Sequence, residues 1–572
     1  MLILRTSASL LYYIIFVLMI PDNPVSNFMG GISYRPINPL IKLWMISASF
    51  IRGESVQYYR KDNHTNKQTV PKNSYNMSKY AIFPDTIGTN SIDIFDQALQ
   101  DALAYDFEGT LNLAGYLRHI LLMRKNPQCI MMEAARHPNR AMFNLENPGI
   151  FKTWLSNVIE RPDDMTEQLK YWIGKFGSKA KLPTCVKKVW ANTLETMLPY
   201  QLLKYKRFIP DLVRISHARS DVNAHLDSIM KTGTTTLSDK QLTWETLRSR
   251  GMSWYEILET LEWKMPHMAA LRNLIPFARS VRDTILIEKY GQMLIGGVEY
   301  GKQFPFRYIT AYRQINKQND GNGSGGRGRG RNGGIRWHPK KLRKVDITHL
   351  TQIIEQCLQK SMINFPKLDG DTLSLCDNSG SAQGAFTSTY GTVRVADIAN
   401  LSALFTAYNT NGRGVVGIFG DKLELFEVNK QVPLLKQYDA ITNIGKNIGT
   451  STENGIWIAF ERSFKFPQPM RFDNIFIYSD MQAGHGGLYG TNPNEYREYL
   501  VENNPRHIDV LKLVQNYRQI VNPLVNLFSV QVAGYDNNLL PENIYRGAIM
   551  SGWTGNEVVY AKRIIDIWNN MI

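Results

Sequence analysis

Apolar residues recur at helical spacing through the first half of the chain, from about Ile92 to Gln314. In the segment LNLAGYLRHILLM, for example, Leu113, Leu117 and Leu121 fall on one face of a helix. The interruptions between such segments are short and contain Pro or Gly, residues that end helices. Many helices joined by short turns over more than two hundred residues predict an α-solenoid or helical-repeat array.

The pattern changes at Thr372, where short apolar runs begin to alternate with amphipathic segments. The segments expected to contain strands are 372–381 (ending in a polar loop), 414–426, 474–480 and 524–532. The segments expected to contain helices are 395–408, 455–464 and 507–520. Strands that alternate with helices predict a doubly wound α/β domain with a parallel sheet. Ligands of such sheets bind beyond the carboxyl ends of the strands.

Two segments fit neither pattern. Residues 1–76 include an uncharged run, 7–20, which at 14 residues is short for a membrane span of about 20. Because Met77 offers another start, we expect residues 1–76 to be an accessory extension, either disordered or the product of a mistaken start site. Residues 318–336 form a Gly/Ser/Asn loop that cannot bury a core. The expected organisation is an extension (1–76), a helical module (77–370) and an α/β domain (371–572).

The whole excess of basic over acidic residues lies before residue 371. The whole chain carries 66 basic and 50 acidic residues, whereas residues 371–572 hold only 16 basic and 19 acidic ones. The net charge of +16 therefore arises before residue 371 and predicts a polyanionic partner for the helical module, unless the surface is merely solvated. The four cysteines form no C-x-x-C pair, which excludes a disulfide scaffold and argues against a zinc site. This usage is typical of a reducing compartment, so we expect a cytoplasmic protein.

Oxygen-bearing side chains follow two predicted strands of the α/β domain. Asp377, Ser379 and Ser381 form a D-x-S-x-S motif after the first strand, and Asp480 ends a later one. Thr450 lies between them in a Gly-Thr step. Carboxylates and hydroxyls gathered at one sheet edge suit Mg²⁺ or another hard divalent cation, and the alternative is ordinary turn and capping chemistry. The set lacks a nucleophile–base pair, so no enzyme activity is expected.

Basic, aromatic and His residues are most densely interleaved in 202–219, LLKYKRFIPDLVRISHAR. Lys and Arg attract phosphate, and aromatic or His rings can stack on unpaired bases. The candidate RNA contacts in this segment are Lys204, Lys206, Arg207, Arg214, His217 and Arg219. Further candidates elsewhere are Arg118, Arg124, Arg136, His137, Lys187, Lys188 and, in the Arg-Gly loop, Arg327, Arg329 and Arg331. Each one alone is more often part of a solvated helix face, and the loop can be a plain linker.

These motifs together resemble the Ro ribonucleoprotein autoantigen family, over about residues 93–572. The matching stretches in the helical part are IERPDDMTEQLKYW, LPTCVKKVW, LLKYKRFIPDLVRISHAR, TWETLRSRGMSWYEILETLEWKMPHMAALRNL, PFRYITAYR and IRWHPKKL. In the α/β part, LSLCDNSGS, IGTS and IFIYSD resemble a metal-ion-dependent adhesion site. The resemblance implies a HEAT-like helical-repeat ring, the TROVE module, followed by a von Willebrand factor A-like domain.

The resemblance also implies a function in RNA quality control. Family members bind small noncoding Y RNAs and the single-stranded ends of misfolded structured RNAs, and an exoribonuclease is an implied protein partner. His217 matches the family's His in the Y RNA-binding segment, although this chain continues with Ala218-Arg219-Ser220 where the family often has x-Lys-Pro. We expect a monomer without a membrane partner. The alternatives are a metal-dependent protein-interaction scaffold and, least favoured because the carboxylates are few, a metal-dependent nuclease.

Overall fold

The computed structural model describes residues 24–26, 32–34, 37–49, 91–303, 305–317, 342–383, 385–388, 391–448, 470–481, 500–501, 504–532, 538–541, 544–551 and 557–570. The chain divides into two compact units. The first comprises Met1–Thr235, Lys367–Asn429 and Tyr438–Ile572, and the second comprises Thr236–Pro366 and Lys430–Gln437. The Arg-Gly loop, 318–336, and the helix expected over 455–464 lie outside the described residues.

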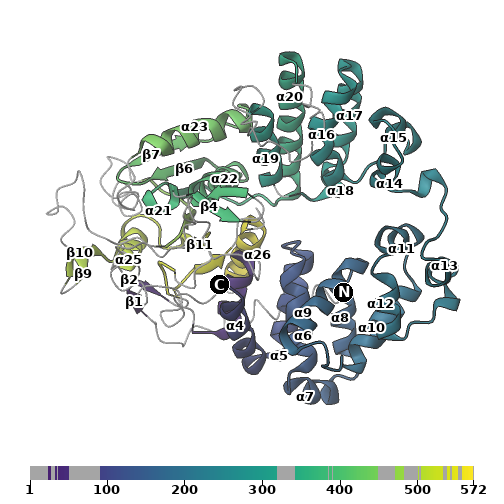
Figure 1. The fold of residues 1–572 in the computed structure, drawn as a ribbon. Helices are drawn as coiled ribbons and strands as arrows, with labels where there is room; N and C mark the ends of the chain where they lie inside the picture. Colours follow the sequence, from purple (N-terminus) through teal and green to yellow (C-terminus); the bar gives the residue numbers. More distant parts are fainter. Residues whose placement is uncertain are drawn as a thin grey trace, which may run out of the picture. The chain divides into compact units, whose positions relative to one another are not determined.

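Helices predominate among the described residues between 91 and 317, as the periodicity predicts, and α20 and η5 follow over the described residues 344–364 (Figure 1). In the first unit they are α4 (Ser91–Tyr105), α5 (Phe107–His119), α6 (Lys125–Arg136), α7 (Asn139–Glu146), α8 (Ile150–Asn157), α9 (Pro162–Phe176), α10 (Thr184–Glu195), α11 (Pro199–Tyr205), α12 (Ile209–Ser216), η3 (Ser220–Val222) and α13 (Ala224–Thr232). Pro162, Pro199 and Pro210 lie in first turns of their helices, where a missing N–H costs nothing.

The second unit is also helical. Its helices are η4 (Asp239–Gln241), α14 (Trp244–Ser249), α15 (Trp254–Thr260), α16 (His267–Val281), α17 (Thr284–Gly296), α18 (Val298–Gly301), α19 (Pro305–Asn316), α20 (Lys344–Ser361) and η5 (Met362–Asn364). At α15, Ser253 and Glu256 form a reciprocal capping box, which fixes the start of that helix. Gly291 of α17 packs so closely on Ile353 of α20 that a side chain there would collide with it.

A six-stranded sheet begins at Thr372, so the predicted change of pattern marks a real change of architecture. Its strands are β3 (Thr372–Asp377), β6 (Gly414–Phe419), β7 (Leu423–Glu427), β8 (Asn474–Ser479), β11 (Asn526–Gln531) and β12 (Gly547–Ser551). They lie in the order β12-β11-β8-β3-β6-β7, and every neighbouring pair is parallel except β6 and β7. The edge strand β7 carries Glu424 and Glu427 on its exposed positions.

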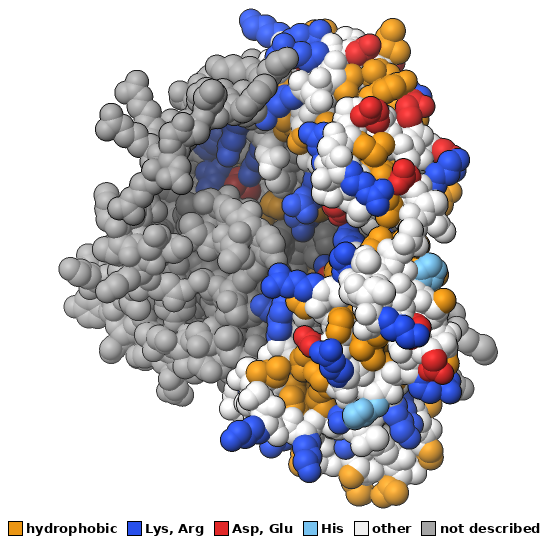
Figure 2. Space-filling model, turned by 45° about the vertical axis from the view of Figure 1, so that its right-hand side comes forward, with side chains coloured by type: hydrophobic (Ala, Val, Ile, Leu, Met, Phe, Trp, Pro, Cys, Tyr) orange, Lys and Arg blue, Asp and Glu red, His pale blue; other side chains and the backbone are white. Residues whose placement is uncertain are grey.

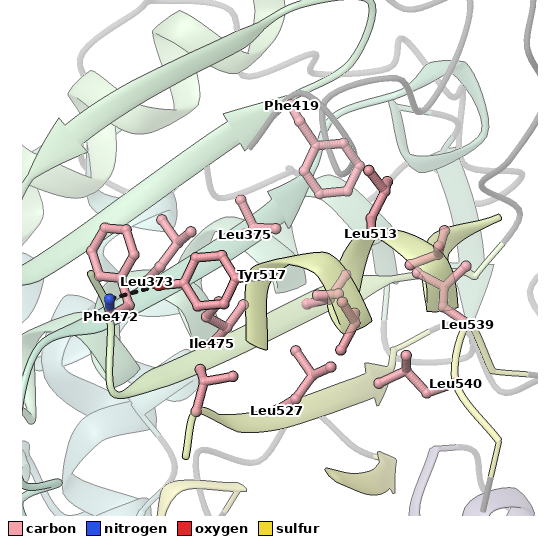
Figure 3. Packing of buried hydrophobic residues seen from close by; sticks show 14 of the residues in the cluster. Leu373, Leu375, Phe419, Phe472, Ile475, Leu513, Tyr517, Leu527, Leu539 and Leu540 are labelled. Atoms are coloured by element: carbon pink, nitrogen blue, oxygen red, sulfur yellow. Dashed lines mark hydrogen bonds between the residues drawn. The ribbon is translucent and has the colours of Figure 1, made fainter. Parts of the chain in front are cut away.

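Helices cover both faces of this sheet. They are α21 (Gly380–Gln383), α22 (Val395–Tyr408), α23 (Leu434–Asn447), α25 (Val510–Ile520) and α26 (Glu557–Asn570), and the short hairpins β4 (Ala385–Ser388)–β5 (Gly391–Arg394) and β9 (Leu500–Val501)–β10 (Asn504–Ile508) complete the domain. On one face, Leu373, Ile475 and Leu527 pack against α25, whose Tyr517 hydroxyl accepts a hydrogen bond from the Phe472 amide (Figure 3). The prediction of a helical module followed by a doubly wound α/β domain is confirmed.

Part of the expected N-terminal extension, residues 1–76, packs within the first unit. Strands β1 (Pro24–Ser26) and β2 (Ile32–Tyr34) pair with each other, and helix α2 (Pro39–Ser49) buries Leu43, Trp44 and Met45. Trp44 lies 5.1 Å, between ring centroids, from Tyr560 of α26. The described part of 1–76 thus differs from the expectation: its polar, aperiodic composition conceals a short apolar helix that is stable only when packed.

Candidate nucleic-acid interface and metal centre

Helices α11 and α12 present a basic surface. Their inner faces bury Leu202, Ile209 and Leu212, which leaves the polar positions outside. The exposed basic residues are Lys204, Lys206, Arg207, Arg214, His217 and Arg219, hereafter the α11–α12 basic surface. His217 ends α12 in the left-handed conformation, with φ 61°. Lys204 lies on α11 and Arg214 on α12, while Lys206, Arg207, His217 and Arg219 lie in the turns that follow these two helices.

The ion pair described within this surface is weak. Arg214 lies 3.7 Å from Asp211, and both side chains are largely exposed, so this pair contributes little. Lys206 donates to the neutral hydroxyl of Thr234 over 3.2 Å. Basic side chains are also spread over the face of the helical part drawn in Figure 2.

Two aromatic rings accompany the basic residues. The side chains of Tyr200 and Phe208 are 44% and 39% exposed. Phe208 belongs to the segment singled out in the sequence, whereas Tyr200 was missed because it precedes that segment. Exposed rings among Lys and Arg can stack on unpaired bases while the cations contact phosphates.

Arg118 is not available to a nucleic acid. Its side chain is 3% exposed, and its Nη2 lies 2.8 Å from Asp164 and 2.9 Å from Glu160. Nearby, Arg124 is partly exposed but forms an ion pair with Asp163. The sequence interpretation of Arg118 as an RNA contact is therefore corrected: a helical position between apolar residues faces the core, and carboxylates 42 and 46 residues away neutralise its charge.

The remaining candidate RNA contacts lie on several different elements. The Arg136 guanidinium lies 4.3 Å from the centre of the Phe176 ring, and burial lowers the pKa of the neighbouring His137. Lys188 is exposed and Lys187 half-buried, both on α10. Arg327, Arg329 and Arg331 lie outside the described residues.

The candidate metal ligands that the structure describes, Asp377, Ser379 and Asp480, lie at the carboxyl edge of the sheet. Asp377 ends β3 and Asp480 directly follows β8, its neighbour in the sheet, and both side chains are buried. The Ser379 amide donates to Asp377 over 2.8 Å, and the Ser479 hydroxyl donates to the other carboxylate oxygen over 2.7 Å. Ser479 is not among the sequence candidates, although a serine that directly precedes the candidate ligand Asp480 is visible in the sequence.

Electrostatics at this edge favours a cation. Burial, together with the nearby Asp480 carboxylate, raises the pKa of Asp377 to about 7. Within the described ranges, no group of three or more His, Cys, Asp or Glu residues could hold a metal, so a cation here would need hydroxyl and water ligands as well. That donor set fits Mg²⁺, which keeps several waters. Thr450 and the side chain of Ser381 lie outside the described part, so their place in the set stays a prediction.

An amide network holds the D-x-S-x-S loop. Asn378 and Asn400 exchange two side-chain hydrogen bonds of 2.7 and 3.1 Å. Gln383 donates to Asn378 over 3.0 Å and accepts from Arg394 over 2.8 Å. Asn378 thus anchors the D-x-S-x-S loop to Asn400 of α22, a role that the sequence does not reveal.

Comparison with known proteins supports the fold assignment. No family model matches the sequence, and no curated protein matches it either. None of the helices in the described part of the chain has the length and apolar character needed to cross a bilayer. The crystal structure of the Deinococcus radiodurans Ro (RSR) protein matches 94% of this chain and 99% of its own, with a TM-score of 0.54 and 12% sequence identity. The resemblance to Ro proteins is thus confirmed at the level of the fold, while closure of the helices into a ring stays a prediction.

Proposed function

We propose that this protein binds RNA through the α11–α12 basic surface. The observation that carries the proposal is the clustering of six exposed basic residues with the exposed rings of Tyr200 and Phe208. Phosphate contacts position such a complex, and stacking of unpaired bases selects single-stranded regions. The Ro-like fold adds support for a small noncoding, Y-like RNA and for the single-stranded ends of misfolded RNAs as ligands. The proposed role is noncatalytic binding in RNA quality control, with an exoribonuclease as a proposed partner.

A salt-titrated RNA-binding measurement tests this proposal. The ligands are a small hairpin RNA with an unpaired end and the same hairpin with a blunt end. Replacement of Lys204, Lys206 and Arg207 together by Gln should weaken binding by at least tenfold at low salt, with a smaller loss at high salt. The matched control variant replaces Lys240, Arg250 and Lys264 by Gln. These are exposed basic residues that already form ion pairs with acidic side chains. Equal losses in both triple variants would show that the α11–α12 basic surface has no special role.

We also propose a Mg²⁺ site formed by Asp377, Ser379 and Asp480, with Ser381 and Thr450 as further ligands. The support is the pair of buried carboxylates on adjacent strands, whose mutual repulsion a divalent cation would relieve. In the alternative function, a protein-interaction scaffold, the cation would bind a carboxylate of a partner protein. RNA binding that is absent, or unchanged by salt and by the triple substitution, would favour that alternative.

A further inference from the structure

Polar side chains form a continuous hydrogen-bonded row along the amino edge of the sheet, opposite the Asp377 edge. The Asn474 amide donates to the Thr372 hydroxyl over 3.2 Å, and the Asn526 amide donates to Asn474 over 2.9 Å. These bonds orient Asn526 so that its oxygen accepts from Nε and Nη2 of Arg546, over 3.0 and 2.7 Å. Arg546 Nη2 also donates to Asn569 over 2.8 Å. The row therefore holds a charged guanidinium, which is only 6% exposed, on neutral partners.

A second arginine lies beside the first. Burial, reinforced by the charge of Arg546, lowers the pKa of Arg518 to about 10. Arg518 Nη2 reaches the Val525 carbonyl over 3.4 Å, and its buried Nε has no hydrogen-bond partner in the described structure. The Arg518 guanidinium carbon lies 5.6 Å from the ring centre of Tyr545, an exposed residue. Two neighbouring cations are thus partly withdrawn from water, which is costly unless an anion compensates them.

The carboxylates described at this edge do not compensate the charges of Arg518 and Arg546, because each carboxylate forms an ion pair with another basic residue. Asp369 lies 2.9 Å from Lys562, Asp371 lies 3.6 Å from Arg413, and Asp473 lies 3.9 Å from Arg471. Among the described residues, neither Arg518 nor Arg546 has an ion pair with Asp or Glu. The amino edge of the sheet therefore carries an excess of positive charge in a fixed position.

We propose that Arg518 and Arg546 form an anion site for the phosphate group of a nucleotide, with the Tyr545 ring beside it for the base. Arginine suits phosphate because its guanidinium donates charge-assisted hydrogen bonds, and in the described structure Nη1 of each of the two arginines has no hydrogen-bond partner. An exposed aromatic ring next to that fork offers a stacking surface for a flat base. The site is independent of the α11–α12 basic surface and of the proposed Mg²⁺ site, since it shares no residue with either.

Calorimetric titration of the full chain with inorganic phosphate, adenosine 5′-monophosphate and adenosine, at constant ionic strength, tests the proposal. We expect the first two to bind, the monophosphate more tightly, and adenosine not to bind. Arg518→Gln should weaken phosphate binding by at least tenfold, because Arg518 is the less buried member of the pair and its loss should leave the fold intact. The matched control is Arg413→Gln at the same edge, an arginine already paired with Asp371, which should change the affinity by less than twofold.

Each other outcome has a defined meaning. Absence of phosphate binding, or equal binding by the wild type and Arg518→Gln, overturns the anion site. Equal affinities for phosphate and the monophosphate overturn the nucleotide assignment, and the same follows if Tyr545→Leu leaves the monophosphate affinity unchanged. Glu542, outside the described residues and four positions before Arg546, is a possible internal competitor. If phosphate binds only to Glu542→Gln, the arginines belong to an intramolecular ion pair and the proposal fails.

Discussion

The guanidinium of Arg118 lies 2.8 Å from the carboxylate of Asp164, with both side chains almost completely buried. Asp164 also accepts hydrogen bonds from the backbone amides of Glu160 and Arg161, at the start of α9. One carboxylate thus caps a helix and neutralises a charge from α5. This double role makes the pair part of the framework that supports the basic surfaces, rather than part of those surfaces.

Arg118→Met should reduce the free energy of unfolding by about 3–5 kcal/mol, because it leaves the buried Asp164 without its cation. Arg124→Gln, at a partly exposed neighbour on the same network, should cost less than about 1 kcal/mol. Urea unfolding of both variants measures the difference. Similar small effects in the two variants would mean that Arg118 is not a structural residue.

Leu43→Ala should reduce the free energy of unfolding by about 2–5 kcal/mol, since Leu43 is fully buried in α2. Ile37→Ala, at an exposed position just before that helix, is the control and should have almost no effect. Thermal unfolding of the full chain supplies the comparison. A start at Met77 would remove α2 altogether and should lower the melting temperature further, so a fully stable 77–572 chain would contradict the packing of this segment.

The second unit should lose stability in mild acid through His267. Burial lowers the pKa of His267 to about 4, and its Nε2 lies 2.8 Å from the Tyr308 hydroxyl. Between pH 6.5 and 4 the unfolded chain therefore binds more protons than the folded one. The contribution of neutral His267 to the free energy of unfolding is fully present above about pH 6.5. It is lost progressively as the pH falls through 4, and the loss at pH 5 is roughly 2 kcal/mol.

Unfolding experiments at pH 7 and pH 5 check this effect. His267→Phe removes the titrating ring and should make the difference between the two pH values smaller, even if the variant is less stable at both. An unchanged difference would assign the acid sensitivity to other groups.

Addition of Mg²⁺ to the metal-free full chain should raise its melting temperature. At a concentration one hundred times the dissociation constant, the stabilisation is about 2.7 kcal/mol. Asp480→Asn should remove most of this effect, because it deletes one of the two buried carboxylates. Sodium chloride at the same ionic strength is the control, and an equal rise with sodium would exclude a specific metal site.

Lys206→Gln should change the salt dependence of RNA binding as well as the affinity. Each phosphate contact to a single strand adds about 0.7 to the slope of log affinity against log salt. Loss of this one exposed lysine should therefore lower the slope by about that amount. Filter binding at several salt concentrations gives the slope, and a parallel shift without a change of slope would place Lys206 away from phosphate.

The elements that follow from local periodicity were predictable from the sequence. The helix around Leu117 and the strand from Thr372 depend on spacings of a few residues, which the chain displays directly. The carboxylates Asp377 and Asp480 were also predictable, because parallel strands bring their carboxyl ends together.

What could not be predicted depends on partners far apart in the sequence. The burial of Arg118 is set by Asp164, 46 residues later. Helix α2 is stabilised by contacts with residues such as Tyr560, more than five hundred positions away. The proximity of Arg518 and Arg546 likewise has no local signature, since Arg518 lies on α25 and Arg546 lies just before β12.

The antiparallel edge strand β7 has a consequence for aggregation of the protein at high concentration. An open sheet edge offers unpaired backbone groups to any extended chain that meets it. Here the strand has five residues, and its glutamates Glu424 and Glu427 are exposed on opposite faces, so a second copy pairing along this edge would bring like charges together. We expect these charges to oppose self-templated growth of the sheet at this edge, so substitution of both glutamates by threonine should increase aggregation of the chain.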